Sequence, residues 1–246
     1  MALSHSPRVI TDGLVLCLDA ANRKSYPTTG TTWTDLSGMG NNGTLVNGVG
    51  YTGSNGGSLS FDGTNDYATI PLSSNFEFGT GQFAVEAWVN CSSLPATKNS
   101  RIIGIGEGAN GGTPLQRTGW TFMIASTTLD WYRYDGTTET RITSTAIPSL
   151  STGKWFHFVA TRDASNTITL SSNGTIISTT PSATTSYNSI NTEPLSIGRW
   201  YDGATPVGYK YLTGNIPVLR IYKGKSLSAA EIKQNYNATK SRYGLT

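Results

Sequence analysis

The sequence is a succession of short runs in which apolar and polar residues alternate, and each run ends in a turn signal. Alternation with a period of two places successive side chains on opposite faces of a β-strand, so that one face of each run can be buried. The clearest run is FAVEAWVNC at residues 83–91. It places Glu86 and Trp88 on one face and five apolar residues on the other, namely Phe83, Val85, Ala87, Val89 and Cys91. Repetition of such runs predicts an all-β fold.

Turn signals join several of these runs into antiparallel pairs. Asp135-Gly136 and the segment Asp163–Asn166 can each reverse the chain. Asn173-Gly174 is the strongest turn dipeptide, because both of its residues tolerate a positive φ. The segment Trp155–Thr180 therefore predicts a three-stranded antiparallel meander.

One convincing helix is predicted, at about residues 228–238. Ser228 is a natural N-cap, and Glu231 three residues later completes a capping box. Ile232 and Tyr236 are one helical turn apart, so we expect the helix to lay these two side chains onto the body of the domain.

Length and composition agree with a single β domain. The chain has 246 residues, and 13% of them are charged, well below the usual share of about 25%. No linker, internal repeat or low-complexity block divides it. We expect a two-sheet antiparallel sandwich over residues 14–246, with the helix included, preceded by an N-terminal extension at residues 1–13.

Charge and hydropathy argue against two classes of partner. The 18 basic residues are spread along the chain, without the basic run typical of a nucleic-acid-binding arm, and the net charge is +3. No stretch approaches the roughly 20 apolar residues of a membrane span. The apolar run Leu14–Leu18 is too short for a signal peptide and is bounded by Asp12 and Asp19. We expect no nucleic-acid partner, no membrane span and no signal peptide.

The two cysteines, Cys17 and Cys91, form neither a disulfide framework nor a zinc pattern. Both lie in strand-like runs, which favours buried thiols that behave as small hydrophobes. A single bridge between them is the alternative.

Several motifs, taken together in their order and spacing, resemble one family. They are LSFDGTNDYATIP, FAVEAWVN, GKWFHFVATRD, LSIGR and LTGNIPVLRIYKGKSLSAAEIKQNYN. The chain resembles, from about Leu14 to Leu245, the laminin-G-like branch of the concanavalin A-like lectin/glucanase superfamily. That resemblance implies a jelly roll of two curved antiparallel sheets, with a concave face often used for ligands. The family includes glycosidases, lectins and interaction modules, so the fold does not settle the function.

The two ends of the chain resemble a narrower group. The opening DGLVLCLDAANRKSYPTTGTTWTDLSGMGNNGTL and the closing SAAEIKQNYNATKSRYGL are similar to versions encoded by tailed bacteriophages, especially those of aquatic bacteria. This resemblance implies a virion protein that is released by lysis, in agreement with the missing signal peptide.

The glutamates do not reproduce the catalytic pattern of the family's retaining glucanases. That pattern alternates two glutamates and an aspartate on one strand and holds two carboxylates about 5 Å apart. The glutamates of this chain are Glu77, Glu86, Glu107, Glu139, Glu193 and Glu231. Glu86 alone lies in a clear strand and has no partner there. His157, between Phe156 and Phe158, is interpreted as a sheet histidine with a local hydrogen bond. His5 lies in the terminal tail. We expect no catalytic residue, although a carboxylate pair from different strands is not ruled out by this pattern.

The acidic turn DGTND at residues 62–66 has two interpretations. Aspartate before glycine is common turn chemistry, because the carboxylate accepts nearby backbone N–H groups. Calcium takes the same kind of oxygen ligands, and related domains often bind calcium at the sandwich rim. The turn interpretation is preferred. A structural calcium site remains the alternative, with no other cofactor expected, and its candidate ligands are Asp19, Asp35, Asp62 and Asp66.

Aromatic and polar residues in two segments are candidates for binding a glycan. In TLDWYRYDG, Tyr132 and Tyr134 share a strand face with Asp130. The stretch GRWYDGATPVGYKY adds a predicted long loop rich in aromatic side chains. Sugar rings stack on aromatic faces, while sugar hydroxyls bind Asp and Arg. The candidates are Tyr132, Tyr134, Arg199, Trp200, Tyr201, Asp202 and Tyr209.

These observations converge on a non-enzymatic bacteriophage virion protein, either a capsid decoration or a tail component. We expect it to present a lectin-like surface to a host polysaccharide and to contact other capsid or tail proteins. One alternative is a structural clamp that recognises no sugar, and a second is an atypical glycoside hydrolase.

Overall fold

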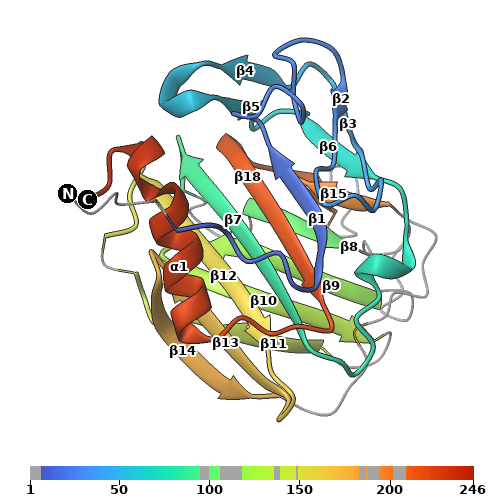
Figure 1. Ribbon diagram of the computed structural model, residues 1–246, viewed down its shortest axis with the longest axis vertical. Helices are drawn as coiled ribbons and strands as arrows, with labels where there is room; N and C mark the ends of the chain where they lie inside the picture. The colour runs from blue at the N-terminus through green and yellow to red at the C-terminus, as the bar shows by residue number, and fades with distance from the viewer. Residues whose placement is uncertain are drawn as a thin grey trace.

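Two eight-stranded antiparallel sheets pack face to face in the computed structural model (Figure 1). The structure describes residues 7–94, 100–105, 118–135, 139–147, 149–182, 187, 194–201 and 209–246. Sheet A runs in the order β14 (Thr175–Pro181), β13 (Thr167–Ser172), β12 (Trp155–Arg162), β7 (Phe83–Cys91), β18 (Thr213–Lys223), β5 (Ser58–Asp62) and β4 (Gly50–Thr52), with β1 (Leu14–Asp19) also paired to β18.

Sheet B forms the second layer. It runs in the order β11 (Glu139–Thr143), β10 (Thr128–Asp135), β9 (Thr118–Ala125), β8 (Ser100–Ile105), β15 (Leu195–Ile197), β6 (Tyr67–Ile70), β3 (Gly43–Val46) and β2 (Thr32–Trp33). A separate two-stranded hairpin consists of β16 (Arg199–Tyr201) and β17 (Tyr209–Tyr211). The predicted two-sheet antiparallel jelly roll is therefore confirmed.

The main core fills the space between the two sheets. Alternate residues of each strand enter it, as the period-two pattern requires. Its largest members are aromatic: Trp120 stacks on Trp131 with ring centroids 5.2 Å apart, and Phe83 stacks on Trp131 at 4.8 Å. Offset stacking of this kind adds to the free energy gained from burying the rings.

Strand β7 is buried on both faces, although its sequence alternates. All nine of its residues are buried. Ala84 and Trp88 point away from the main core and contact a second layer, which contains Ile232, Leu227 and Tyr236. Figure 1 shows that the helix α1 (Ala229–Thr239) lies across the outer surface of sheet A and supplies that layer.

The predicted helix and its capping are confirmed. Ser228 accepts a hydrogen bond from the backbone N–H of Glu231, whose side chain in turn accepts from the Ser228 backbone. Ile232 and Tyr236 are buried against the sheet. A 3-10 turn, Lys240–Tyr243, follows the helix and places Tyr243 on Trp88 with ring centroids 4.2 Å apart.

The predicted meander is also confirmed. Strands β12, β13 and β14 pair in order, and Asn173 and Gly174 turn the chain with φ values of 51° and 73°. Asp163 starts the earlier turn, in which its side chain accepts the N–H groups of Ser165 and Thr167. Strands β10 and β11 pair as a hairpin, while Gly136 of their predicted turn lies outside the described residues.

The described part of the N-terminal extension packs against α1. The Ile10 N–H donates to Asn235 Oδ1 at 2.8 Å, and the Arg8 carbonyl accepts from Gln234. Cys17 and Cys91 are both free thiols, the first half-buried and the second buried. In the described ranges no helix is long and apolar enough to span a membrane.

Strand β18 connects the parts of sheet A. It pairs with β7 along one side, and along the other it pairs first with β5 and then with β1. Pro217 lies at this change of partner, where the register with β7 is also shifted. Because proline has no N–H to donate, it is tolerated at such an irregularity.

Gly214 of β18 should be essential for the close approach to β7. A Cβ at its φ of 154° would lie 2.2 Å from the Asn90 carbonyl oxygen, so we expect Gly214→Ala to reduce the free energy of unfolding by about 2 kcal/mol or more. The control Gly224→Ala has a φ of 74° and nothing within 4 Å, so it should cost only about 1 kcal/mol. Urea unfolding measures both, and equal losses would contradict the proposed clash.

Candidate functional site

The outer side of sheet B carries a row of polar side chains. Trp120, Phe122 and Trp131 point into the core, so the residues that alternate with them, such as Thr121 and Tyr132, point outward. Strand register extends the row, because Arg141, Tyr132, Thr121, Gly104, Ser196 and Thr69 are successive cross-strand neighbours. We define the polar face as Tyr67, Thr69, Arg101, Thr121, Asp130, Tyr132, Arg141, Ser196 and Arg199.

Arg101 organises the centre of the polar face. Its guanidinium donates to Ser196 Oγ at 2.9 Å and to Thr121 Oγ1 at 2.7 Å. Gly104 leaves room for it, since a Cβ there would lie 3.0 Å from Arg101 Nε and 2.7 Å from the Thr121 hydroxyl. Arg101, Thr121 and Ser196 are all buried, so they form a fixed hydrogen-bonded group at the centre of the face, and the accessible side chains lie around it.

Asp130 holds Arg141 at one end of the polar face. The Asp130 carboxylate is fully buried and accepts from Arg141 Nε at 2.6 Å, from a second guanidinium nitrogen and from Thr128 Oγ1 at 3.2 Å. The Arg141 side chain is 34% exposed and lies directly across from Tyr132, which is half-buried. A guanidinium held in this way reaches the surface with its orientation already set.

Arg199 connects the β16–β17 hairpin to the same face. Its guanidinium carbon lies 4.0 Å from the centre of the Tyr67 ring, within the range of a cation–π contact. Its backbone carbonyl accepts from Ser196 Oγ at 3.2 Å. The hairpin is therefore joined to the row of side chains that includes Tyr132.

The structure thus places two of the predicted glycan-binding residues, Tyr132 and Arg199, at opposite ends of the polar face. Trp200 is half-buried on β16, opposite Lys210 in the hairpin. The other candidates fall where the structure gives no side-chain detail: the backbones of Tyr134, Tyr201 and Tyr209 belong to β10, β16 and β17, and Asp202 lies outside the described residues. Sequence reasoning missed Arg101, whose only local signal is an arginine at the start of the apolar run RIIGI.

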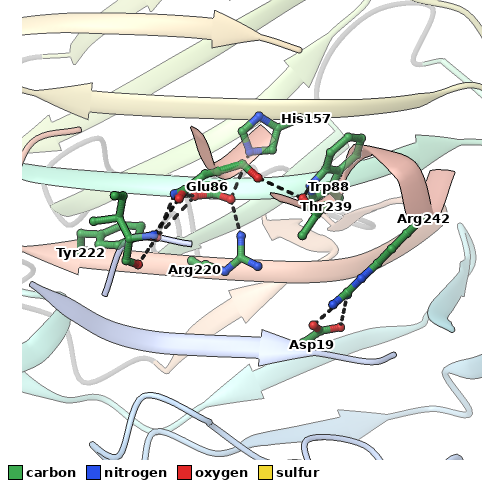
Figure 2. Close-up of polar contacts among 10 residues, drawn as sticks. Asp19, Glu86, Trp88, His157, Arg220, Tyr222, Thr239 and Arg242 are labelled. Carbon is green, nitrogen blue, oxygen red and sulfur yellow. Dashed lines mark hydrogen bonds and ion pairs between the residues drawn. The ribbon is translucent and has the colours of Figure 1, made fainter. Parts of the chain in front are cut away.

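A second polar cluster lies under α1, on the outer side of sheet A (Figure 2). Glu86 is fully buried and pairs with Arg220 from the neighbouring strand β18. His157 Nε2, from β12, lies 3.0 Å from the same carboxylate oxygen. The other oxygen accepts from Asn235 Nδ2 of α1 at 2.6 Å, and the Tyr222 hydroxyl lies 3.5 Å away. Figure 2 shows His157, Arg220 and Tyr222 converging on Glu86 from the two strands that flank β7.

The surroundings of Glu86 keep it ionised. Burial alone would raise the pKa of its carboxyl group, but Arg220, His157 and Asn235 outweigh burial and lower the pKa to about 2. The carboxylate in turn raises the pKa of Arg220 against the opposing effect of burial. Burial, together with the Glu86 charge, raises the pKa of Tyr222.

This cluster is structural in character. Glu86 has no exposed surface, and the rings of Trp88 and Tyr236 both lie beside His157, with centroids 5.1 and 5.8 Å away. His157 is a buried sheet histidine, as interpreted from the sequence, but its contact with Glu86 was not foreseen. A substrate has no access to either group in this arrangement.

Two of the four candidate calcium ligands are engaged separately by protein groups. Asp19 forms a bidentate ion pair with Arg242, at 2.8 and 3.0 Å. Asp35 accepts the backbone N–H groups of Cys17, Ser37 and Asn41, together with the Ser37 hydroxyl. Each of the two carboxylates therefore stabilises a different contact.

The other two candidates, Asp62 and Asp66, form the turn between β5 and β6. Asp62 accepts the Thr64 N–H at 2.7 Å, an interaction that lowers its pKa, and Gly63 has a φ of 78°. Asp66 accepts the Asp62 N–H, and burial raises its pKa. Throughout the part of the chain that the structure describes, no three His, Cys, Asp or Glu side chains are placed to hold a metal. The turn chemistry is as predicted, and calcium binding stays an untested expectation.

Glu86→Gln should lower the free energy of unfolding at pH 7 by about 3 kcal/mol, because the amide leaves the Arg220 charge buried without its partner. In the wild type the lowered pKa contributes stability that is fully present above pH 4.5, the ordinary value, and is lost as the pH falls through about 2. The variant should therefore lose less stability over that interval.

Urea denaturation followed by tryptophan fluorescence at stepped pH measures this difference. Parallel pH dependences for the wild type and Glu86→Gln would contradict the assignment.

Solved structures with a similar fold are binding domains of a mosquitocidal protein and of botulinum neurotoxins. The binding domain of Paraclostridial Mosquitocidal Protein 1 is 17% identical with a TM-score of 0.70, over 96% of this chain and 56% of that one. The serotype D neurotoxin binding domain is 18% identical with a TM-score of 0.67, over 92% and 52%. The serotype D ligand-binding domain in complex with N-acetylneuraminic acid is 18% identical with a TM-score of 0.68, over 92% and 51%. This chain spans about half the length of these proteins, and the likeness shows the fold alone.

No curated protein matches the sequence. A family model does match, over residues 62–233, from the last residue of β5 into α1. Its description is the concanavalin A-like lectin/glucanases superfamily. Together with the two antiparallel sheets, this match shows that the chain belongs to the laminin-G-like branch of the concanavalin A-like lectin/glucanase superfamily.

Proposed function

We propose that this protein is a non-enzymatic binding module whose polar face takes a glycan. The observation that carries the proposal is the strand register of sheet B, which aligns Arg141, Tyr132, Thr121, Ser196 and Thr69 side by side across its outer surface. Buried hydrogen bonds from Arg101 to Thr121 and Ser196 fix the centre of this row, and Asp130 orients the accessible Arg141. Such preorganisation lowers the entropy cost of binding.

The chemistry of the accessible groups suits a sugar. Tyr132 is half-buried and offers part of an aromatic ring and a hydroxyl. Arg141 offers guanidinium donors that Asp130 has already oriented. At the other end of the face, Tyr67 and Arg199 repeat the combination of an aromatic ring and a guanidinium. Sugars present apolar ring faces and hydroxyl groups together, so these pairs match both surfaces of the ligand.

Two further observations support this proposal. The fold neighbours include a binding domain in complex with N-acetylneuraminic acid and another in complex with "SialylT". In this chain, the buried carboxylates of Glu86 and Asp130 are each neutralised by an arginine, which leaves neither in the role of a nucleophile or general acid.

We further propose that the module works on a bacteriophage particle, as a capsid decoration or tail component. The support for this location is the resemblance of the opening and closing segments to versions from tailed phages. On such a particle the polar face would point toward host polysaccharide, while other surfaces would contact capsid or tail proteins.

Tyr132→Ala should weaken glycan binding by at least tenfold, because it removes the aromatic ring that lies beside Arg141 at one end of the polar face. Glycan-array binding of the purified protein, followed by titration of the strongest hit, measures the effect. Trp155→Ala is the matched control, since Trp155 is a half-buried aromatic residue on sheet A that packs on Tyr243.

Three outcomes would count against the proposal. Absence of array binding, together with particles that burst when the protein is missing, would favour a structural clamp. Equal losses of glycan affinity in Tyr132→Ala and Trp155→Ala would show that the glycan does not bind at the polar face. Release of reducing sugar from the glycan would show that the protein is an enzyme.

A further inference from the structure

A groove of about 180 Å³ opens on the outer side of sheet A, where the first turn of α1 meets β13 and β14. The groove is on sheet A, whereas the polar face is on sheet B. Its lining residues are Thr161, Asp163, Thr167, Thr169, Ile176, Ser226, Leu227, Ser228, Ala229 and Ile232. We call it the α1 groove.

The floor of the α1 groove is a row of threonines. Thr161, Thr169 and Thr179 are cross-strand neighbours on β12, β13 and β14, and the first two line the groove. The Thr161 hydroxyl is already used, because it donates to the Phe83 carbonyl and accepts from the Leu227 N–H. The hydroxyls of Thr167 and Thr169 have no hydrogen-bond partner in the described part of the chain, and both residues are half-buried.

The wall of the groove is apolar. Ile176 is 43% exposed, one of the few large hydrophobic residues at the surface of the described chain. It faces the groove together with Ala229 and Ile232 from α1. An occupant would therefore meet hydroxyl groups on one side and aliphatic carbon on another.

The charge of the groove narrows the class of ligand. Asp163 is the one charged lining residue, and the nearby Lys225 and Glu231 pair with each other at 2.7 Å. A lone carboxylate disfavours anions, while it accepts hydrogen bonds from hydroxyl groups. It is also insufficient for calcium, which takes six to eight oxygen ligands, and one Asp163 oxygen is already occupied by the Ser165 and Thr167 N–H groups.

We propose that the α1 groove is a second ligand site, separate from the polar face, that binds the ring of one neutral sugar. Thr167 and Thr169 supply the two hydroxyls that are not already used within the described chain, Asp163 supplies a charged acceptor, and the Ile176 wall covers an apolar ring face. A ligand of this size makes few contacts, so the expected dissociation constant is millimolar.

Two-dimensional 15N–1H NMR titration with methyl glucoside and with N-acetylglucosamine tests the proposal. Saturable shifts in the backbone amides of Thr167, Thr169 and Ala229, with a millimolar dissociation constant for at least one probe, are expected. Thr169→Val removes one groove hydroxyl and keeps the β-branched shape, so it should weaken binding at least fivefold. The control is Thr179→Val, the same change at an exposed position in the same row outside the groove.

Absent or non-saturating shifts for both probes in the wild type would overturn the proposal, whether or not the variants fold. Equal affinities for Thr169→Val and Thr179→Val would also overturn it. Tyr132→Ala separates the two sites, because it should leave groove binding unchanged. Sugar shifts that map only to the polar face, with none in the α1 groove, and that vanish in Tyr132→Ala would refute the α1 groove while supporting the polar face.

Discussion

The rest of the structure depends on the buried ion pair between Glu86 and Arg220. Both charges lie on the outer side of sheet A, where an unpaired carboxylate would cost several kcal/mol. Asn235 of α1 completes the hydrogen bonding of Glu86 and also binds the Ile10 backbone, while Trp88 donates to Thr239 at 2.9 Å. The helix and the N-terminal segment are thus required by the sandwich, because without them Glu86, Arg220 and Trp88 on the outer side of sheet A would be exposed to water.

This closure keeps Glu86 out of reach of any ligand. Strand β7 is enclosed on both sides, by the main core and by α1, so its carboxylate serves the fold. Sheet B lacks such a helix in the described chain, and its outer surface carries polar groups that are held in place by buried ones. Asp130 orients the accessible Arg141, as Glu86 holds the helix through Asn235. A buried charged side chain with fixed partners therefore has a role on each sheet. On sheet A it holds the helix α1 in place, and on sheet B it fixes the polar side chains of the outer surface.

Sequence reasoning succeeded where structure is decided locally. The capping box at Ser228, the turn at Asn173-Gly174 and the carboxylate turn at Asp62 each need only neighbouring residues, and all were predicted. It failed where partners are distant. Glu86 appeared isolated because Arg220 is 134 residues away, and the placement of Arg101 depends on the registers of β8, β9 and β15. Tyr132 and Arg199 were both candidates, but only the strand order shows that they share a face.

The central claim is that the outer surface of sheet B receives the glycan. Hydrogen–deuterium exchange, measured with and without a saturating amount of the strongest-binding oligosaccharide, tests this most directly. The account predicts slower amide exchange in β10, β11 and the β16–β17 hairpin, and unchanged exchange of the backbone amides around Glu86 in β7. Protection confined to other strands, or no protection in β10 and β11 at saturation, would contradict it.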